Sequence, residues 1–184
     1  SDRTGVTRRA ARHAVDRPLS GILPIAKRNP SPTRMHPTLP ESALHCLLLA
    51  DPDAKIAALD ALHADWLKGL VPLAGSSEPA QTIDAPGRPE KPPLVPPQNV
   101  PRRSVGTREG HAALIHALAH IEFNAINLAL DAAYRFLNLP RDYYADWLQV
   151  AFEEAYHFRL LREHLRNLGY DYGAFSAHDG LWGT

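Results

Sequence analysis

The stretch that decides the fold runs from Thr107 to Leu168 and reads TREGHAALIHALAHIEFNAINLALDAAYRFLNLPRDYYADWLQVAFEEAYHFRLLREHLRNL. It contains no glycine after Gly110 and a single proline, Pro140, and alanine and leucine dominate its first half. Such a composition is typical of long α-helices. We therefore predict one helix over 107–137 and a second over 142–168, separated by a turn at 138–141.

A short turn between two long helices makes them antiparallel neighbours. Gly169 directly follows the second predicted helix, where glycine commonly supplies a left-handed cap. The sequence has no alternating apolar pattern of the kind that predicts strands. We therefore predict the all-α fold class, with one long helix pair at its centre.

Two further segments precede this helix pair. Residues 36–70 form a predicted N-terminal helical preface. In it, a turn-rich apolar stretch over 41–50 leads to a helix that starts at Asp51-Pro52 and ends at Gly69. Residues 71–106 are rich in proline, with nine prolines between positions 72 and 101, which excludes a helix or a central strand. We interpret this segment as an extended strap along the body, with a proline-rich partner-binding motif as the alternative.

The first 34 residues form the most basic part of the chain. They hold eight basic and two acidic side chains, whereas residues 35–184 hold twelve and eighteen. The arm has no sustained apolar periodicity, and four prolines interrupt it. An arginine-rich, acid-poor organelle transit peptide has this composition, but so does a disordered basic arm, or sequence upstream of a start at Met35. We infer no function from it.

Composition excludes several classes of protein. Twenty basic and twenty acidic side chains give no net charge, so no global attraction to nucleic acid is expected. The single cysteine, Cys46, excludes an intramolecular disulfide framework and favours a reducing compartment, here the cytoplasm. No uninterrupted apolar run reaches the roughly 20 residues of a membrane-spanning helix, so we expect no membrane partner.

Two acidic residues and one histidine fall on the apolar stripes of the predicted helix pair. Glu122 lies on the stripe of the first helix, and Glu154 and His157 lie one turn apart on that of the second. Counted from the turn, Glu122 and Glu154 are each roughly 20–24 Å away at 1.5 Å per residue, and so lie at the same level. The spacing predicts that the three side chains converge. The apolar members of the two stripes are Ile115, Leu118, Ala119, Ile126 and Ala129, and Trp147, Val150, Leu161 and Leu165.

Two carboxylates and an imidazole are ligands that suit iron, manganese or zinc. A carboxylate on an apolar face is costly to bury unless something neutralises it, and a divalent metal would do so. Two alternatives remain open. The residues can form a hydrogen-bonded Glu–His pair of the core without metal, and Glu153, four residues before His157, competes with Glu154 as a ligand.

A second polar stripe follows another face of the first predicted helix. His116 and His120, four residues apart, could bind a metal ion, but we favour a helix–helix contact or a set that hydrogen-bonds the metal ligands. The remaining members of this stripe are Asn124, Asn127 and Asp131.

The segment after the helix pair ends in His178-Asp179, which suggests either an acid–base dyad or a helix cap. No nucleophile accompanies this pair, so a hydrolase triad is not supported. The sequence also has no glycine-rich phosphate-binding loop. His164 is expected at the surface.

Several motifs resemble a bacterial ferritin-like family of unknown function, which is distantly similar to the tRNA hydroxylase that acts on isopentenylated adenosine. Those of the helix pair are HALAHIE over 116–122 and FEEAYHF over 152–158. GYDYG over 169–173 and HDGLW over 178–182 follow it, and DPDAK over 51–55, PGRP over 86–89 and PRR over 101–103 precede it. The resemblance covers roughly residues 36–182.

The resemblance implies a four-helix bundle with a two-metal carboxylate centre of the di-iron type. Glu122 would then be a ligand from the first helix, Glu154 a bridging carboxylate and His157 a terminal imidazole, with iron as the expected metal and manganese as the other possibility. The implied activity is that of an oxygen-dependent oxidoreductase or hydroxylase of unknown substrate. A tRNA partner follows from analogy of fold alone.

The sequence departs from the family at its end. Residues 107–184 correspond to the first half of a ferritin-like bundle, whereas the family continues into a second helix pair with the other Glu and Glu-x-x-His. We therefore expect the site to be completed by a missing C-terminal helix pair or by a second chain, as in a homo-oligomer. The alternative function is a non-catalytic helical interaction module, in which Glu122, Glu154 and His157 form a buried network.

Overall fold

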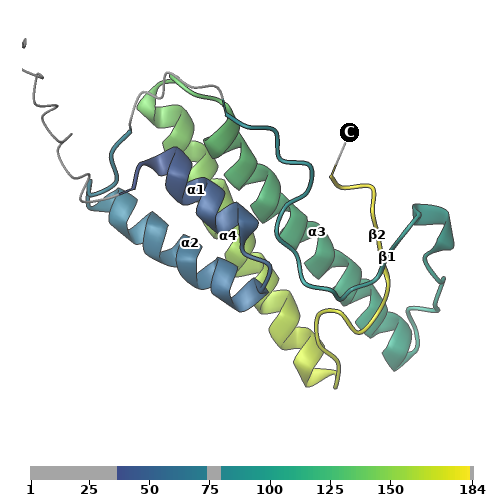
Figure 1. Ribbon diagram of the computed structural model, residues 1–184. Coiled ribbons are helices and arrows are strands. Elements are labelled where there is room, and N and C mark those ends of the chain that lie inside the picture. The colour runs from purple at the N-terminus through teal and green to yellow at the C-terminus, as the bar shows by residue number, and fades with distance from the viewer. Residues whose placement is uncertain (1–36, 74–79, 183–184) are drawn as a thin grey trace, which may run out of the picture. The chain divides into compact units, whose positions relative to one another are not determined.

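The computed structural model describes residues 37–73 and 80–182 (Figure 1). The arm predicted at 1–34 lies outside the described residues. In chain order the elements are α1 (Leu39–Leu48), α2 (Pro52–Leu67), β1 (Leu94–Val95), a 3₁₀ turn (Pro97–Asn99), α3 (Arg108–Arg135), α4 (Arg141–Asn167) and β2 (Ala177–His178). The mostly helical content confirms the all-α prediction.

The predicted helix pair is formed by α3 and α4, with bounds within two residues of the expected ones. The α3 helix begins at a cap in which the Thr107 hydroxyl accepts a hydrogen bond from the Gly110 N–H, at 3.0 Å. Asn138 adopts a left-handed φ of 61° in the turn, and Gly169 closes α4 with a φ of 85°. Local signals in the sequence therefore fix both ends of the hairpin.

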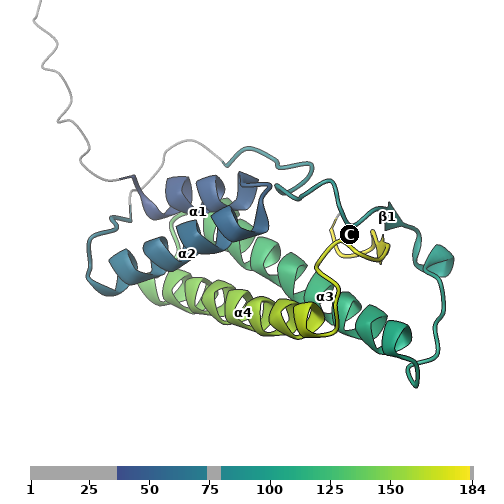
Figure 2. The ribbon, with the colours of Figure 1, turned by 90° about the horizontal axis from the view of Figure 1, so that it is seen from below.

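The helical preface consists of two helices packed on one side of the hairpin, α1 against α3 and α2 against α4 (Figure 2). The α1 helix replaces the turn-rich stretch expected over 41–50. Glu41 explains it, because its carboxylate reaches back to the Thr38 N–H at 2.7 Å and so closes a capping box. As predicted, Asp51 caps α2, and its side chain accepts a hydrogen bond from the Ala54 N–H at 2.8 Å.

The described part of the proline-rich segment, residues 80–106, contains no α-helix, but it has more regular structure than its composition suggests. Leu94 and Val95 pair in parallel with Ala177 and His178. This small two-stranded sheet ties the strap to the segment after α4. The two-residue strands are too short to leave a periodic signal, which explains why the sequence analysis found none.

The α3 helix is long and apolar enough to span a membrane by length and composition alone. The sequence analysis missed this because it looked for an uninterrupted apolar run, whereas α3 mixes apolar and polar residues. Half of the most apolar window is buried against the rest of the molecule. Four polar side chains of α3 are also buried inside the protein, namely His116, His120, Asn124 and Asn127. These features are typical of the core helix of a globular domain.

Candidate metal centre

The structure brings Glu122 on α3 together with Glu154 and His157 on α4. One potential ligand atom from each of the three lies within 4.8 Å of the other two. The Nδ1 atom of His157 lies 3.1 Å from Oε2 of Glu154, within hydrogen-bonding distance. Both glutamates are partly buried, and His157 is exposed. The convergence predicted from residue spacing is thus present, and it opens toward solvent.

Of the two neighbouring glutamates on α4, only Glu154 belongs to this cluster. Glu153 is exposed, and its carboxylate accepts a hydrogen bond from the Gln149 side chain at 2.8 Å. Consecutive residues of a helix point about 100° apart, so the two carboxylates cannot face α3 together. Glu153 therefore provides a matched control for Glu154 within the same helical turn.

The two carboxylates of the cluster affect each other's protonation. Partial burial, together with the hydrogen bond and negative charge of Glu154, raises the pKa of Glu122 to about 7, and His157 opposes the rise. The hydrogen bond from Glu122 lowers the pKa of Glu154, and His157 contributes to the same effect. At neutral pH Glu122 is therefore protonated in only about half of the molecules, and a cation bound between the two carboxylates would displace that proton.

The surroundings of the cluster differ from the expected buried stripe. Ala119, Ile126 and Ala129 are buried as predicted, but Leu118 is 40% exposed and Val150 is 36% exposed. No described helix covers this side of the α3/α4 pair, because α1 and α2 lie on the other side (Figure 2). Further exposed apolar side chains on the two helices are Leu114, Ile121, Leu128 and Leu160. The cluster thus lies on a helix pair that exposes much apolar surface.

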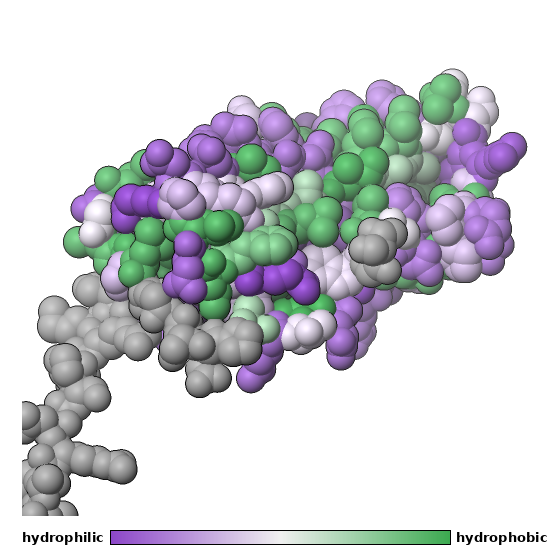
Figure 3. Space-filling view, turned by 90° about the horizontal axis from the view of Figure 1, so that it is seen from above, coloured by the Kyte–Doolittle hydropathy of each residue, from purple (hydrophilic) through white to green (hydrophobic). Residues whose placement is uncertain are grey.

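Hydrophobic side chains also reach the surface on the face seen from above, as green patches among purple hydrophilic groups (Figure 3). Scattered exposure of this kind is normal for a globular protein. The open side of α3/α4 is different, because exposed Leu118 and Val150 each lie one helical turn from a candidate ligand, Glu122 and Glu154 respectively.

The second polar stripe of α3 is buried but does not contact the candidate ligands, which corrects one part of our interpretation. The two nitrogens of His120 lie 2.9 Å from the Tyr172 hydroxyl and 3.0 Å from the His178 carbonyl oxygen. Nε2 of His116 accepts a hydrogen bond from the Gly173 N–H at 3.0 Å. These histidines attach the C-terminal segment to α3 and do not orient Glu122.

These bonds also fix the protonation of the two rings. Since a carbonyl only accepts, His120 carries its proton on Nε2 and accepts from Tyr172 at Nδ1, and His116 is unprotonated at Nε2. Burial lowers the pKa of His116 to about 4 and also lowers the pKa of His120. Both rings are therefore neutral at physiological pH.

The pair His178-Asp179 forms neither of the two expected arrangements. His178 belongs to β2 and uses its carbonyl oxygen to hold His120, while the Asp179 N–H donates to the Val95 carbonyl. Both residues thus serve the attachment of the strap. His164 is exposed, as predicted.

A buried lysine was missed by the sequence analysis. Lys55 on α2 is fully buried, and its Nζ donates to the Leu47 carbonyl and to Oδ1 of Asn127, each at 2.7 Å. Burial lowers its pKa to about 7. The signal was available, because Lys55 lies four residues before Leu59 on the apolar stripe of α2. It joins the end of α1 to α2 and α3.

Comparison with known proteins places the chain among uncharacterised relatives. Residues 48–184 match the family described as protein of unknown function DUF455. An uncharacterised protein of Haemophilus influenzae is 46% identical over 145 residues, which are 74% of this chain and 50% of the relative. The chain thus spans about half the length of this relative.

No solved structure shows a significant match. Neither of the two matches describes a ferritin-like bundle or a tRNA hydroxylase, so both of those likenesses stay predictions. The match to the family covers well over half of the sequence and includes every candidate ligand. The chain therefore belongs to the DUF455 family of proteins of unknown function.

Proposed function

We propose that this chain is a metal-binding protein of the ferritin-like, di-iron carboxylate type. The observation that carries the proposal is the convergence of Glu122, Glu154 and His157 from two helices, with ligand atoms within 4.8 Å of one another. A cation between the two carboxylates would relieve the repulsion that helps to raise the pKa of Glu122. The hydrogen bond to Glu154 already orients the His157 ring beside them.

The donor set fits iron or manganese. Carboxylate oxygens and an imidazole nitrogen are typical ligands of these ions, and no thiolate is near to favour a softer metal. Three donors leave coordination positions open, and the cluster lies on the uncovered side of α3/α4. The remaining ligands are then supplied from outside the described residues, by a further helix pair of a longer chain or by a second copy in a homo-oligomer.

The proposed activity is that of an oxygen-dependent oxidoreductase or hydroxylase in the cytoplasm. A bound iron ion would supply the chemistry with dioxygen, and Glu122, Glu154 and His157 would hold it. The substrate is open, and tRNA enters only through the resemblance of the sequence motifs to a tRNA hydroxylase.

The test is elemental analysis of protein purified without chelator. We expect iron or manganese in the wild type, and at least about a tenfold lower metal content in Glu154→Ala and in His157→Ala. Glu153→Ala removes a carboxylate from the adjacent position and should retain the metal. Equal metal content in all four proteins would contradict the assignment, as would absence of metal from folded wild type supplied with iron and manganese.

A second candidate function is a non-catalytic helical interaction module. The hydrogen bond between His157 and Glu154 favours it, because this pair satisfies polar groups without an ion. The exposed apolar side chains of α3, among them Ile121 at 43%, would then contact a partner. Folded protein that binds neither iron nor manganese, and whose Glu154→Ala variant loses stability because the pair with His157 is broken, would favour this function over the first.

A further inference from the structure

A hollow of about 210 Å³ lies under the strap, on a different side of α3 from the metal cluster. Its walls come from three segments, namely the strap, the first half of α3 and the segment around β2. The residues of α3 that line it lie roughly 80–180° around the helix from Glu122, and none is a candidate ligand; they are Gly110, Ala113, Leu114, Ala117 and His120. The hollow is therefore separate from the candidate metal centre.

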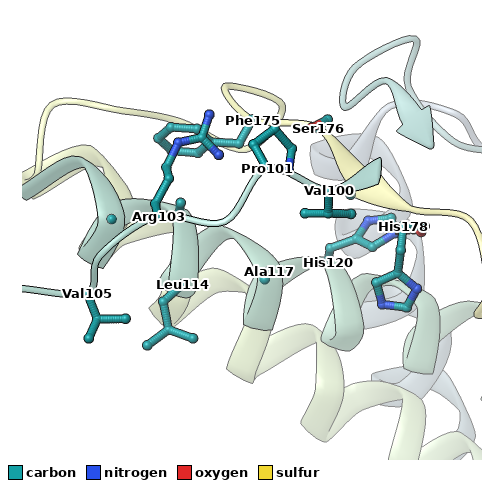
Figure 4. A pocket seen from close by; sticks show the side chains of 13 residues that line it. Val100, Pro101, Arg103, Val105, Leu114, Ala117, His120, Phe175, Ser176 and His178 are labelled. Atoms are coloured by element: carbon teal, nitrogen blue, oxygen red, sulfur yellow. Dashed lines mark hydrogen bonds between the residues drawn. The ribbon is translucent and has the colours of Figure 1, made fainter. Parts of the chain in front are cut away.

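The lining is mostly apolar, with polar groups at two ends. Figure 4 shows Arg103 beside the ring of Phe175 at one end and His120 with His178 at the other, with Val100 and Pro101 between them. No acidic side chain is among the described residues that line the hollow. An apolar cleft with a few placed polar groups is the usual form of a small-molecule site, and this one is smaller than the roughly 300–1,000 Å³ of most such sites.

The guanidinium group of Arg103 has contacts on one side but retains free hydrogen-bond donors. It lies 4.9 Å from the centre of the Phe175 ring, and its Nε donates to the Glu109 carboxylate at 2.9 Å. Its two terminal nitrogens have no hydrogen-bond partner within residues 37–73 and 80–182. An arginine fixed by stacking loses little side-chain freedom when it binds a carboxylate through these nitrogens.

The opposite end offers an imidazole. The His178 ring lies 5.8 Å from that of His120, in an edge-to-face arrangement. His120 cannot serve a ligand, because both of its nitrogens are engaged with Tyr172 and His178. The ring nitrogens of His178 make no hydrogen bond to any described residue, since its one such bond uses the carbonyl.

We propose that this hollow binds a small carboxylate with a flat apolar body, whose carboxylate pairs with Arg103 and whose body packs between the strap and α3. The cation at one end selects the charge of the ligand, and the apolar walls select its body. The small volume limits the ligand to a single ring or a short chain. Because Glu109 pairs with Nε, the two terminal nitrogens stay available to bind the carboxylate of a ligand.

The probe is 3-phenylpropanoate, compared with its neutral amide 3-phenylpropanamide, in titrations of the full chain followed by ¹H–¹⁵N NMR. We expect saturable shifts of the Gly110 and Ser176 amides with the carboxylate, and binding of the amide weakened at least about tenfold. Because this comparison changes only the probe, it does not depend on whether any variant folds.

Two variants locate the site. Arg103→Gln should weaken carboxylate binding at least about tenfold, whereas Arg102→Gln removes an exposed charge from the neighbouring position and should leave it unchanged. Ala117→Phe should abolish binding of both probes by filling the hollow. Pre-treatment with a chelator should have no effect, which separates this result from that of the metal test.

Three results would overturn the proposal. The first is equal affinity for the carboxylate and the amide. The second is an equal loss in Arg102→Gln and Arg103→Gln, which would show attraction to general positive charge. The third is no saturable shift in the wild type up to the solubility limit of the probe.

Discussion

The α3 helix carries polar side chains on two sides, and these differ in their burial and in their hydrogen bonding. On one side, His116, His120 and Asn124 are almost fully buried, and each has a partner within the chain. On the other side, Glu122 and its neighbours on α4 are partly exposed, and two carboxylates compete for one proton. These three buried side chains form hydrogen bonds that hold the fold together, and in the same stripe Nδ2 of Asn127 is buried without a partner. The partly exposed cluster remains accessible to a ligand.

This difference separates a structural polar set from a candidate functional one. Buried polar groups stabilise a fold only when they are paired, so removing one partner is costly. Partly exposed groups can turn to water instead, so their loss costs little stability. Four predictions test the comparison, in order of decreasing effect.

The largest effect is expected for Lys55→Met. The variant keeps the length of the side chain but leaves Oδ1 of Asn127 buried without a donor, and the Leu47 carbonyl then accepts only from the Gly87 N–H. We expect the free energy of unfolding to fall by about 2–4 kcal/mol. Urea denaturation followed by circular dichroism measures it, with the exposed Lys68→Met as the control. A loss below about 1 kcal/mol would show that this contact does not anchor α1 and α2.

The next effect is expected for His120→Leu, which removes the bonds to Tyr172 and to the His178 carbonyl. We expect a loss of about 2 kcal/mol, because two buried groups remain unpaired. Hydrogen exchange of the Ala177 and Asp179 amides should also become faster, since His120 holds the segment that carries them. His164→Leu changes an exposed histidine and should alter neither quantity. Unchanged exchange would break the assignment of His120 as an anchor.

The third effect concerns the pH dependence of stability, and between pH 7 and 9 it is of about the same size as the second, about 2 kcal/mol. Burial lowers the pKa of Lys55 from 10.5 to about 7, so between these values the unfolded chain binds a proton that the folded protein has released. Stability contributed by this group therefore rises with pH from about 7 to 10.5, by at most about 1.4 kcal/mol per unit. The neutral amine still has two hydrogens for its two acceptors.

The measurement for this third prediction is the free energy of unfolding at pH 7, 8 and 9. The rise expected for the wild type should be absent from Lys55→Met. If the profiles of the two proteins are parallel, Lys55 does not release its proton in this range.

The smallest effect is expected for Glu154→Ala in metal-free protein. Its partners are partly exposed, so the free energy of unfolding should change by less than about 1 kcal/mol. The same variant should lose its metal, so stability and binding separate at this residue. Denaturation in the presence of a chelator provides the measurement. A loss as large as that of Lys55→Met would place the cluster with the structural set.

Much of the fold follows from the sequence because its signals are local. The Thr107 cap, the turn at Asn138 and the glycine at 169 lie within one helical turn of the ends that they define. The convergence of the candidate ligands could be predicted for the same reason. Two regular helices that leave one turn have a fixed rise per residue, so residue counts show which positions lie at the same distance from the turn. The capping box of Thr38 and Glu41 is also a local signal, so the α1 helix that it starts could have been predicted from the sequence.

The sequence by itself determined the antiparallel helix pair and the meeting of Glu122 with Glu154 and His157, since helix geometry repeats at a fixed rise and angle. Only the tertiary structure decided which side of α3 is buried. The apolar periodicity predicted that the side with Leu118 is buried. In the structure Leu118 is 40% exposed, whereas His116 on the other side is 1% exposed. The physical reason is that hydrogen-bond partners from Gly173, Tyr172 and His178, more than 50 residues away, compensate the burial of the two histidines.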